Sequence, residues 1–336
     1  MRVRTYYAKL CLIQISVPGQ IVLVDPLRLG NLKNFIDWIC HRNTLVIMHS
    51  ARQDLEVLFQ FFGYLPQRLF DTQIASALAG FGDQIGYAGL VWELLGRALP
   101  KSQTRTDWST RPLSDAQLQY AREDVHYLAE LYRLLDRRLA DLDRQSWLLE
   151  ECDELLRPEH YTNDPETIWV RSISGAHLGP AAQHRLKALL IWRERAAQKK
   201  NLPREWIARN GTLMEIARQA PLQRHALANI EGCGPKFVRR WGEQLLDILS
   251  CTEAEQRLSV WGDGQRLTSS EEIRLRQLKI QTRSVADQLQ IPPALLANRK
   301  QLEQVVRGQE KGPLFRGWRL QVLGREILDK APQEQP

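Results

Sequence analysis

The sequence predicts an α/β domain with a mixed sheet over residues 1–150, followed by two small all-α domains. Three observations support this division. β-Rich runs alternate with helical segments before residue 150, helical periodicity alone continues from about residue 178, and a Gly- and Ser-rich break lies at 261–270. A chain of 336 residues is also long enough for two or three domains.

The first elements expected are a hairpin, a helix and a strand. The β-rich runs at 10–17 and 20–25 flank Pro18 and Gly19, which is a hairpin signal. Residues 32–39 have helical spacing, and residues 44–48 form a short apolar run typical of a buried strand. We expect Ser50 to cap the next helix, which ends at Gly63.

Further helices follow along the chain. Asp71 is expected to cap a helix over 72–79, and the capping box of Ser114 and Gln117 opens a long helix reaching about residue 139. The region 151–177, with an acidic, Pro-bearing stretch at 157–166, is expected to be a linker. Helical segments then predict one domain at 178–252 and a second at 270–330. The helices expected in the first domain are 186–198, 205–208, 213–219 and 237–249. Those expected in the second are 271–289, 293–306 and 318–328.

Composition narrows the class of protein. No apolar run reaches the roughly 18 residues that a membrane span needs, and no signal peptide follows Arg2 and Arg4. The five cysteines are odd in number and scattered, and none lies in a C-x-x-C pair, which argues against a disulfide framework or a zinc knuckle. These features predict a cytoplasmic protein.

The positive charge is local. The net charge of the chain is +7, and residues 181–250 alone contain 13 Lys and Arg against 6 Asp and Glu. A basic block of this kind suggests a polyanionic partner such as nucleic acid. A solvated basic face is the alternative.

Carboxylates near the expected sheet are the main candidates for chemistry. No P-loop, G-x-S-x-G elbow or H-E-x-x-H motif is present. Asp54 lies one turn into the helix that follows the strand at 44–48, so it should be near the rim of the sheet, where α/β proteins place sites. Tyr120 and Asp124 are four residues apart on the long helix and share a face. A helix-dipole role for Asp54 and simple packing of the Tyr120–Asp124 pair remain alternatives.

Taken together, the motifs resemble the ribonuclease D family, which are 3′–5′ exoribonucleases of the DEDD superfamily, in its tyrosine subgroup. The matching segments are 49–58, 71–73, 101–108, 111–113 and 120–128. The resemblance implies a ribonuclease H-like fold and two divalent ions, Mg²⁺ or Mn²⁺, in the active site. It implies that Asp54 and Asp124 bind metal and that Tyr120 orients the attacking water. Two ions held by carboxylates can activate water and stabilise the leaving oxygen.

Basic residues before the long helix fit the same chemistry. Lys101 and Arg105 lie in the loop that also contains Asp107 and Trp108, where the resemblance implies contact with substrate phosphates. The alternative is a loop held together by a local salt bridge.

The segment 178–250 resembles an HRDC domain, a helical nucleic-acid-binding bundle. Its Gly232-Cys233-Gly234-Pro235 turn precedes a helix with Lys236, Arg239 and Arg240, which would form a seat for phosphate. A plain turn with a solvated basic face is the alternative. Residues 270–330 are expected to be a second, more diverged HRDC-like module.

The resemblance also sets expectations about substrate and about the start of the chain. The substrates implied are tRNA precursors or other structured RNAs with 3′ tails, with no membrane and no obligate protein partner. The family's first motif, an Asp-x-Glu on the opening strand, would precede Thr5-Tyr6-Tyr7, and the sequence does not contain it. We expect Met1 to be an internal methionine, with that strand encoded in frame upstream.

The alternative is a catalytically inactive RNA-binding homologue. In either case, without that strand the runs at 10–25 and 44–48 are expected to have unpaired edges.

Overall fold

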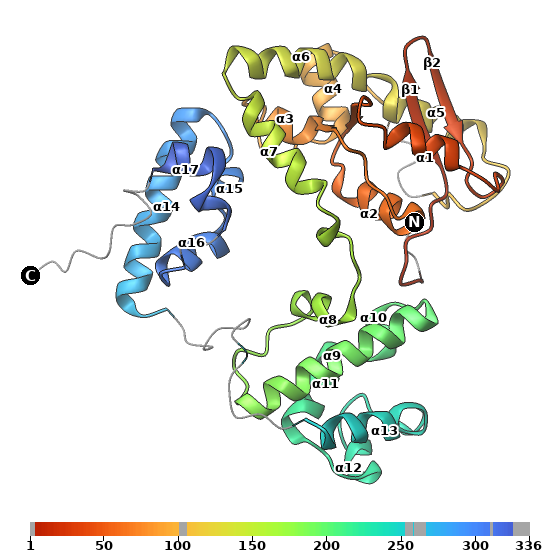
Figure 1. Ribbon diagram of the computed structural model, residues 1–336, viewed down its shortest axis with the longest axis vertical. Helices are drawn as coiled ribbons and strands as arrows, with labels where there is room; N and C mark the ends of the chain where they lie inside the picture. The colour runs from red at the N-terminus through yellow and green to blue at the C-terminus, as the bar shows by residue number, and fades with distance from the viewer. Residues whose placement is uncertain (1–3, 101–105, 253–257, 259–266, 310–311, 325–336) are drawn as a thin grey trace, which may run out of the picture. The chain divides into compact units, whose positions relative to one another are not determined.

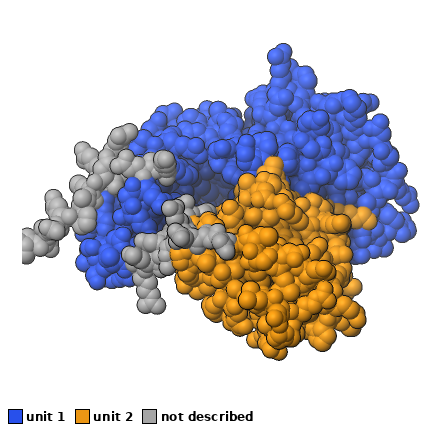
Figure 2. All heavy atoms as spheres, turned by 60° about the horizontal axis from the view of Figure 1, so that its bottom comes forward, with its two compact units in different colours: residues 1, 10–161, 267–336 blue, residues 2–9, 162–266 orange. Residues whose placement is uncertain are grey.

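The computed structural model describes residues 4–100, 106–252, 258, 267–309 and 312–324 (Figure 1). They belong to two compact units, which Figure 2 shows in different colours. Unit 1 contains residues 10–161 together with the chain from residue 267, and unit 2 contains residues 2–9 and 162–266. Each unit has a hydrophobic core of its own.

Unit 1 contains two pairs of strands. β1 (Ile13–Val17) and β2 (Gln20–Val24) form the predicted antiparallel hairpin, and β3 (Val46–Met48) pairs in parallel with β4 (Leu69–Asp71). Among the described residues these are two separate two-stranded sheets, not one mixed sheet. β1 and β3 therefore each have one paired edge, as expected from the sequence.

Helices surround the strands of unit 1. They are α1 (Lys33–Ile39), α2 (Arg52–Phe62), α3 (Thr72–Leu78), α4 (Tyr87–Leu95), α5 (Asp115–His126), α6 (Leu128–Asp141) and α7 (Gln145–Leu155), followed by the 3₁₀ helix η1 (Pro158–His160). The long helix predicted from Ser114 to about residue 139 is divided into α5 and α6 at Tyr127. The backbone N–H of Tyr127 donates to the Tyr87 hydroxyl, 3.0 Å away, and this bond takes the place of a helical one.

The helix starts agree with the sequence at two positions and differ at a third. Ser114 and Gln117 form the predicted capping box, and Asp71 caps α3. Ser50 does not cap α2 as predicted. It has a left-handed φ of 59°, and the residue before the helix is Ala51, whose side chain makes no capping bond. The carboxylate of Asp71 accepts from the backbone N–H groups of both residues instead.

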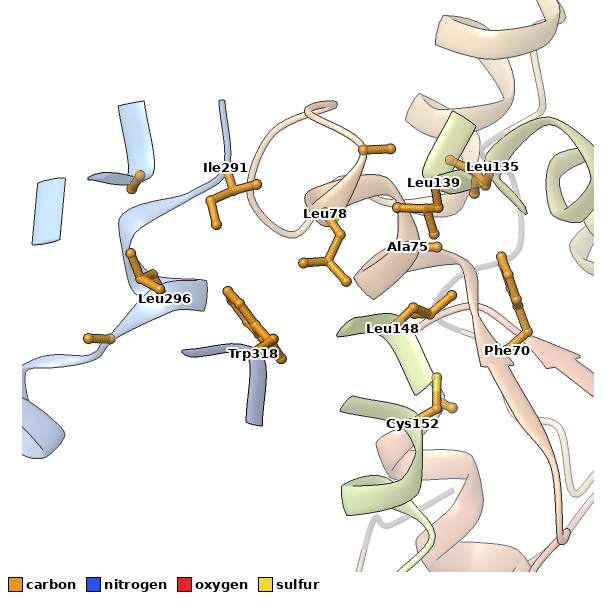
Figure 3. Close-up of a cluster of buried hydrophobic side chains, with 14 of the residues drawn as sticks. Phe70, Ala75, Leu78, Leu135, Leu139, Leu148, Cys152, Ile291, Leu296 and Trp318 are labelled. Carbon is orange, nitrogen blue, oxygen red and sulfur yellow. The ribbon is translucent and has the colours of Figure 1, made fainter. Parts of the chain in front are cut away.

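The last described helices of the chain pack into unit 1. They are α14 (Ser269–Leu289), α15 (Pro293–Leu296), α16 (Arg299–Val306), η4 (Pro313–Phe315) and α17 (Gly317–Leu323). Figure 3 shows Ile291, Leu296 and Trp318 in the same buried cluster as Leu78 and Leu148. The stretch predicted as a separate domain at 270–330 thus shares a core with the α/β region. Helical periodicity reveals an apolar face but not the surface that covers it.

Unit 2 is helical. It contains α8 (Pro165–Ile168), η2 (Trp169–Arg171), α9 (Pro180–Lys200), α10 (Arg204–Ile207), α11 (Asn210–Gln219), α12 (Arg224–Ala228) and α13 (Pro235–Ser250). The expected linker at 151–177 is therefore largely helical: its first residues continue α7, and its later ones form α8 and η2. No described helix is long and apolar enough to cross a membrane.

The segment before β1 joins the core of unit 2. The Tyr6 ring is buried there, and its hydroxyl donates to the carboxylate of Glu194, which is itself buried. Arg204 pairs with the same carboxylate, with its Nε 2.5 Å from Oε2. These contacts fasten the start of the chain to α9 and α10.

Candidate active site

Asp54 lies in the first turn of α2, where the chain has just left β3. Carboxylates are favourable in a first helical turn because the helix dipole and the unpaired N–H groups attract negative charge. Part of the Asp54 side chain is exposed, yet surrounding protein displaces enough water to raise the pKa of the carboxyl. The negative charge of Asp71 raises this pKa further.

Asp124 and Tyr120 lie on one face of α5, as their spacing predicts. The Tyr120 hydroxyl hydrogen-bonds to the Asp124 carboxylate, and its ring lies 6.1 Å from that of Trp108, centroid to centroid. Burial and the negative charge of Asp54 raise the pKa of Asp124 to about 6, although the bond from Tyr120 opposes this shift. Burial and Asp124 together also raise the pKa of Tyr120, so its hydroxyl stays protonated at neutral pH.

The structure brings Asp54 and Asp124 to a single pocket of about 530 Å³. Residues of β1 line one part of this pocket, and residues of β3 line another. Most of the lining side chains are apolar. His49 and Tyr87 also line it. Apolar surroundings disfavour ionised carboxylates, which explains the direction of both pKa shifts.

The pair of carboxylates suits a divalent cation. Both are partly desolvated, each lacks an ion pair in the described part of the chain, and Asp54 raises the pKa of Asp124 by repulsion. A hard cation with oxygen ligands would relieve that repulsion. Among the described residues no group of three or more His, Cys, Asp and Glu forms a metal site, and Asp54 and Asp124 are the two carboxylates that line this pocket.

Arg111 anchors the loop before α5. Its guanidinium pairs with the Asp25 carboxylate at the end of β2, with distances of 2.6 and 2.8 Å. It also donates to the carbonyl oxygens of Cys11 and Trp108. The loop that leads to Tyr120 and Asp124 is thereby tied to the β1–β2 hairpin. Lys101 and Arg105, predicted to contact phosphates from this loop, lie outside the described residues.

In unit 2, Lys236, Arg239 and Arg240 lie in the first turns of α13, and all three are exposed. The Arg240 guanidinium lies over the ring of Trp241, 5.0 Å from its centroid. Three cations at a helix N-terminus would attract phosphate.

The turn before α13 contains two glycines, Gly232 and Gly234, whose surroundings differ. Gly232 has a left-handed φ of 87°, and a Cβ at this position would lie only 2.2 Å from Thr212 Oγ1. Both the backbone conformation and the contact with Thr212 therefore favour glycine. A Cβ on Gly234 would meet nothing within 4 Å. Packing inside unit 2 therefore accounts for Gly232 without a ligand.

Comparison with known proteins identifies the chain. Residues 1–140 match the 3′-5′ exonuclease family model, and residues 182–249 match the HRDC domain. Ribonuclease D of Gluconacetobacter diazotrophicus is 35% identical over 338 residues, covering 98% of this chain and 84% of that protein. Ribonuclease D of Xanthomonas oryzae pv. oryzae is 34% identical over 328 residues, covering 98% and 90%. The chain belongs to the ribonuclease D family.

Solved structures agree with this family. The crystal structure of Escherichia coli RNase D, described as an exoribonuclease involved in structured RNA processing, matches with a TM-score of 0.87 and 28% identity. The match covers 98% of this chain and 90% of that one. The catalytic core of RRP6 from Trypanosoma brucei, at 23% identity and a TM-score of 0.54, shares the fold.

Membership in the ribonuclease D family confirms the predicted class of enzyme, a 3′–5′ exoribonuclease, and the predicted order of an exonuclease domain followed by an HRDC domain. It also implies dependence on divalent metal and a nucleic acid substrate. The likeness of 270–330 to a second HRDC module stays a prediction.

Two contributors to the site were not assigned a role from the sequence. Tyr87 lines the pocket and holds the α5–α6 junction, and no pattern around it distinguishes it from an ordinary core tyrosine. Asp71 was expected only to cap α3, yet it also contacts the start of α2. His49, which follows β3 and also lines the pocket, bonds through Nδ1 to Thr72 Oγ1 at 2.9 Å.

Proposed function

We propose that this protein trims the 3′ ends of structured RNAs, such as tRNA precursors, one nucleotide at a time. The observation that carries the proposal is the meeting of Asp54 and Asp124 in one pocket, with Tyr120 bonded to Asp124, in a chain of the ribonuclease D family. The reaction class is hydrolysis of the terminal phosphodiester.

Asp54 and Asp124 would hold Mg²⁺ or Mn²⁺, two ions in the complete site. Bound divalent ions lower the pKa of the attacking water and neutralise charge on the leaving 3′ oxygen. Asp124 must be ionised for this, so its raised pKa makes metal and proton competitors for one carboxylate. The apolar walls of the pocket strengthen the attraction between each carboxylate and a cation.

Tyr120 would orient the attacking water. Its hydroxyl proton is donated to Asp124, which leaves the oxygen lone pairs available to accept a hydrogen bond from water. Since its pKa is raised, the hydroxyl keeps that proton through the neutral range. The Trp108 ring beside it limits the positions that the phenol can take.

RNA would be held by unit 2, through Lys236, Arg239 and Arg240 at the start of α13. Lys101 and Arg105 would contact phosphates nearer the cleaved end. In this division residues 1–150 are the exonuclease domain, 178–252 the HRDC domain and 270–330 an HRDC-like module, and the enzyme acts in the cytoplasm without an obligate protein partner.

The test compares the protein with its Asp124→Asn variant on a duplex RNA with a single-stranded 3′ tail, in Mn²⁺. We expect the protein to shorten the tail stepwise and the variant to lose trimming while binding RNA with nearly equal affinity. Trimming by Asp124→Asn at an undiminished rate contradicts the assigned role. RNA binding without trimming by the unmodified protein favours the alternative, an inactive RNA-binding homologue.

A further inference from the structure

The Asp71 carboxylate receives hydrogen bonds from two different helix starts. Oδ1 accepts from the backbone N–H groups of Gln73 at 2.8 Å and Ile74 at 3.4 Å, which caps α3. The same oxygen accepts from Ser50 N–H at 3.1 Å, and Oδ2 accepts from Ala51 N–H at 2.7 Å. Asp71 is only 2% exposed, so these four donors replace water around its charge.

The start of α2 depends on this contact. Ala51 offers no capping side chain, and Ser50, in a left-handed conformation, makes none either. The unpaired N–H groups of a helix start need acceptors, and here the acceptor comes from a residue 20 positions further along the chain. Asp71 therefore sets where α2 begins and in which direction it leaves β3.

Neighbouring contacts hold Asp71 against β3. Asp71 is the register partner of Met48 in the parallel β3–β4 pair. Thr72, fully buried, donates from Oγ1 to the Met48 carbonyl at 3.1 Å. These contacts fix the position of the Asp71 carboxylate relative to the end of β3. The start of α2 is hydrogen-bonded to that carboxylate.

Asp54 is the third residue of α2, only three positions after Ala51. A shift or rotation of the first turn would move its carboxylate directly. We propose that Asp71 is a positioning residue of the active site, which holds the first turn of α2 so that Asp54 and Asp124 face one metal ion. The inference rests on the proposed function, because it needs Asp54 to be a metal ligand.

Two variants separate this role from the capping of α3. Asp71→Asn has nearly the same shape, but its amide nitrogen is a donor. An amide nitrogen at the position of Oδ2 cannot accept the hydrogen bond from the Ala51 N–H. Asp71→Ser can still cap α3, because serine is a good N-cap, yet it is too short to reach α2. Asp164→Asn is the matched control, since Asp164 caps α8 in unit 2 by accepting from Glu166 N–H.

The measurement is titration of the whole protein with Mn²⁺ by calorimetry. We expect Asp71→Asn and Asp71→Ser to weaken binding by about 10–100-fold, as losses of groups that orient metal ligands do. Asp164→Asn should bind like the unmodified protein, and Asp54→Asn should weaken binding at least as much as the Asp71 variants. A purely structural defect would lower the stoichiometry instead of the affinity.

Hydrogen exchange supplies a readout that needs no metal. The amides of Ser50 and Ala51 should exchange faster in both Asp71 variants. Faster exchange with unchanged Mn²⁺ affinity would overturn the inference, and so would exchange that is unaltered. An unmodified protein that binds no Mn²⁺ would contradict the proposed function itself and remove the basis of the inference with it.

Discussion

The indole of Trp147 stacks on the indole of Trp318, with ring centroids 4.7 Å apart and planes inclined by 13°. Trp147 belongs to α7 and Trp318 to α17, which lie on the two separate stretches of chain that form unit 1. The Trp318 backbone N–H and indole N–H donate to Glu150 and Glu151, also on α7. The last helices are therefore built into the same core that supports the α/β region.

Trp318→Ala should consequently destabilise unit 1 as a whole. The side chain is fully buried, and removing a buried tryptophan costs about 3–5 kcal/mol of unfolding free energy. Urea unfolding would measure this cost, with hydrogen exchange in α3 and α7 showing where protection is lost. Trp206→Ala is the control, because that ring is 59% exposed. Protection that falls only in α14–α17 would show that these helices unfold independently.

Local patterns in the sequence predicted the elements whose signals are local. The hairpin, the capping box at Ser114 and the shared face of Tyr120 and Asp124 depend on residues within a few positions of one another. The expectations that failed depend on distant partners. Asp71, and not Ser50, accepts the hydrogen bond from the start of α2. The Tyr87 hydroxyl, 40 positions away, accepts from the backbone N–H of Tyr127, where the predicted helix is interrupted. Periodicity carries no information about such pairings.

Arg111 should be needed to hold the loop before α5. Its pair with Asp25 is mostly shielded, with side chains 15% and 24% exposed, and its loss also deprives the carbonyls of Cys11 and Trp108 of a donor. We expect Arg111→Ala to cost about 2–4 kcal/mol of unfolding free energy, as the loss of one partner from a shielded pair does. Arg111→Lys should recover only part, because an ammonium cannot reproduce the planar fork.

The cost of Arg111→Ala should also depend on pH. Arg111 lowers the pKa of Asp25 in the folded protein, so the stabilisation is present above the unfolded pKa of Asp25 and is lost as the pH falls through the lower, folded value. Denaturant unfolding from pH 7 down to pH 3 would measure this loss. Arg157→Ala, at an exposed ion pair with Glu154, should cost little at any pH. An equal cost for the two variants at pH 7 would contradict the anchoring role.

Asp124 should reduce stability at neutral pH. Its folded pKa of about 6 lies above its unfolded value, so the folded state binds the proton more tightly, and stability falls as the pH rises from the unfolded pKa to about 6. Asp124→Asn should therefore raise the unfolding free energy at pH 7.5 by about 1–2 kcal/mol, since one pKa unit equals roughly 1.4 kcal/mol and the side chain is half-buried. The gain should fade between pH 6 and pH 4. Thermal unfolding in EDTA measures it, and a variant less stable than the parent at pH 7.5 would refute this account.

The cations at the start of α13 should account for part of the salt dependence of RNA binding. Each Lys or Arg that neutralises a phosphate releases a counterion, so the triple replacement of Lys236, Arg239 and Arg240 by Ala should flatten the slope of log K against log salt by about 2–3. Fluorescence anisotropy of a tailed RNA duplex between 50 and 200 mM salt, roughly the range in which such slopes are well determined, gives the measurement.

The charge-matched control replaces three exposed cations of α6, Arg133, Arg137 and Arg138, and should leave the slope unchanged if α6 does not contact RNA. Since both triple variants change the net charge equally, a general loss of positive charge would lower both slopes alike and would remove α13 from the RNA-binding surface. A change confined to the α13 variant would instead locate phosphate contacts in the first turns of that helix.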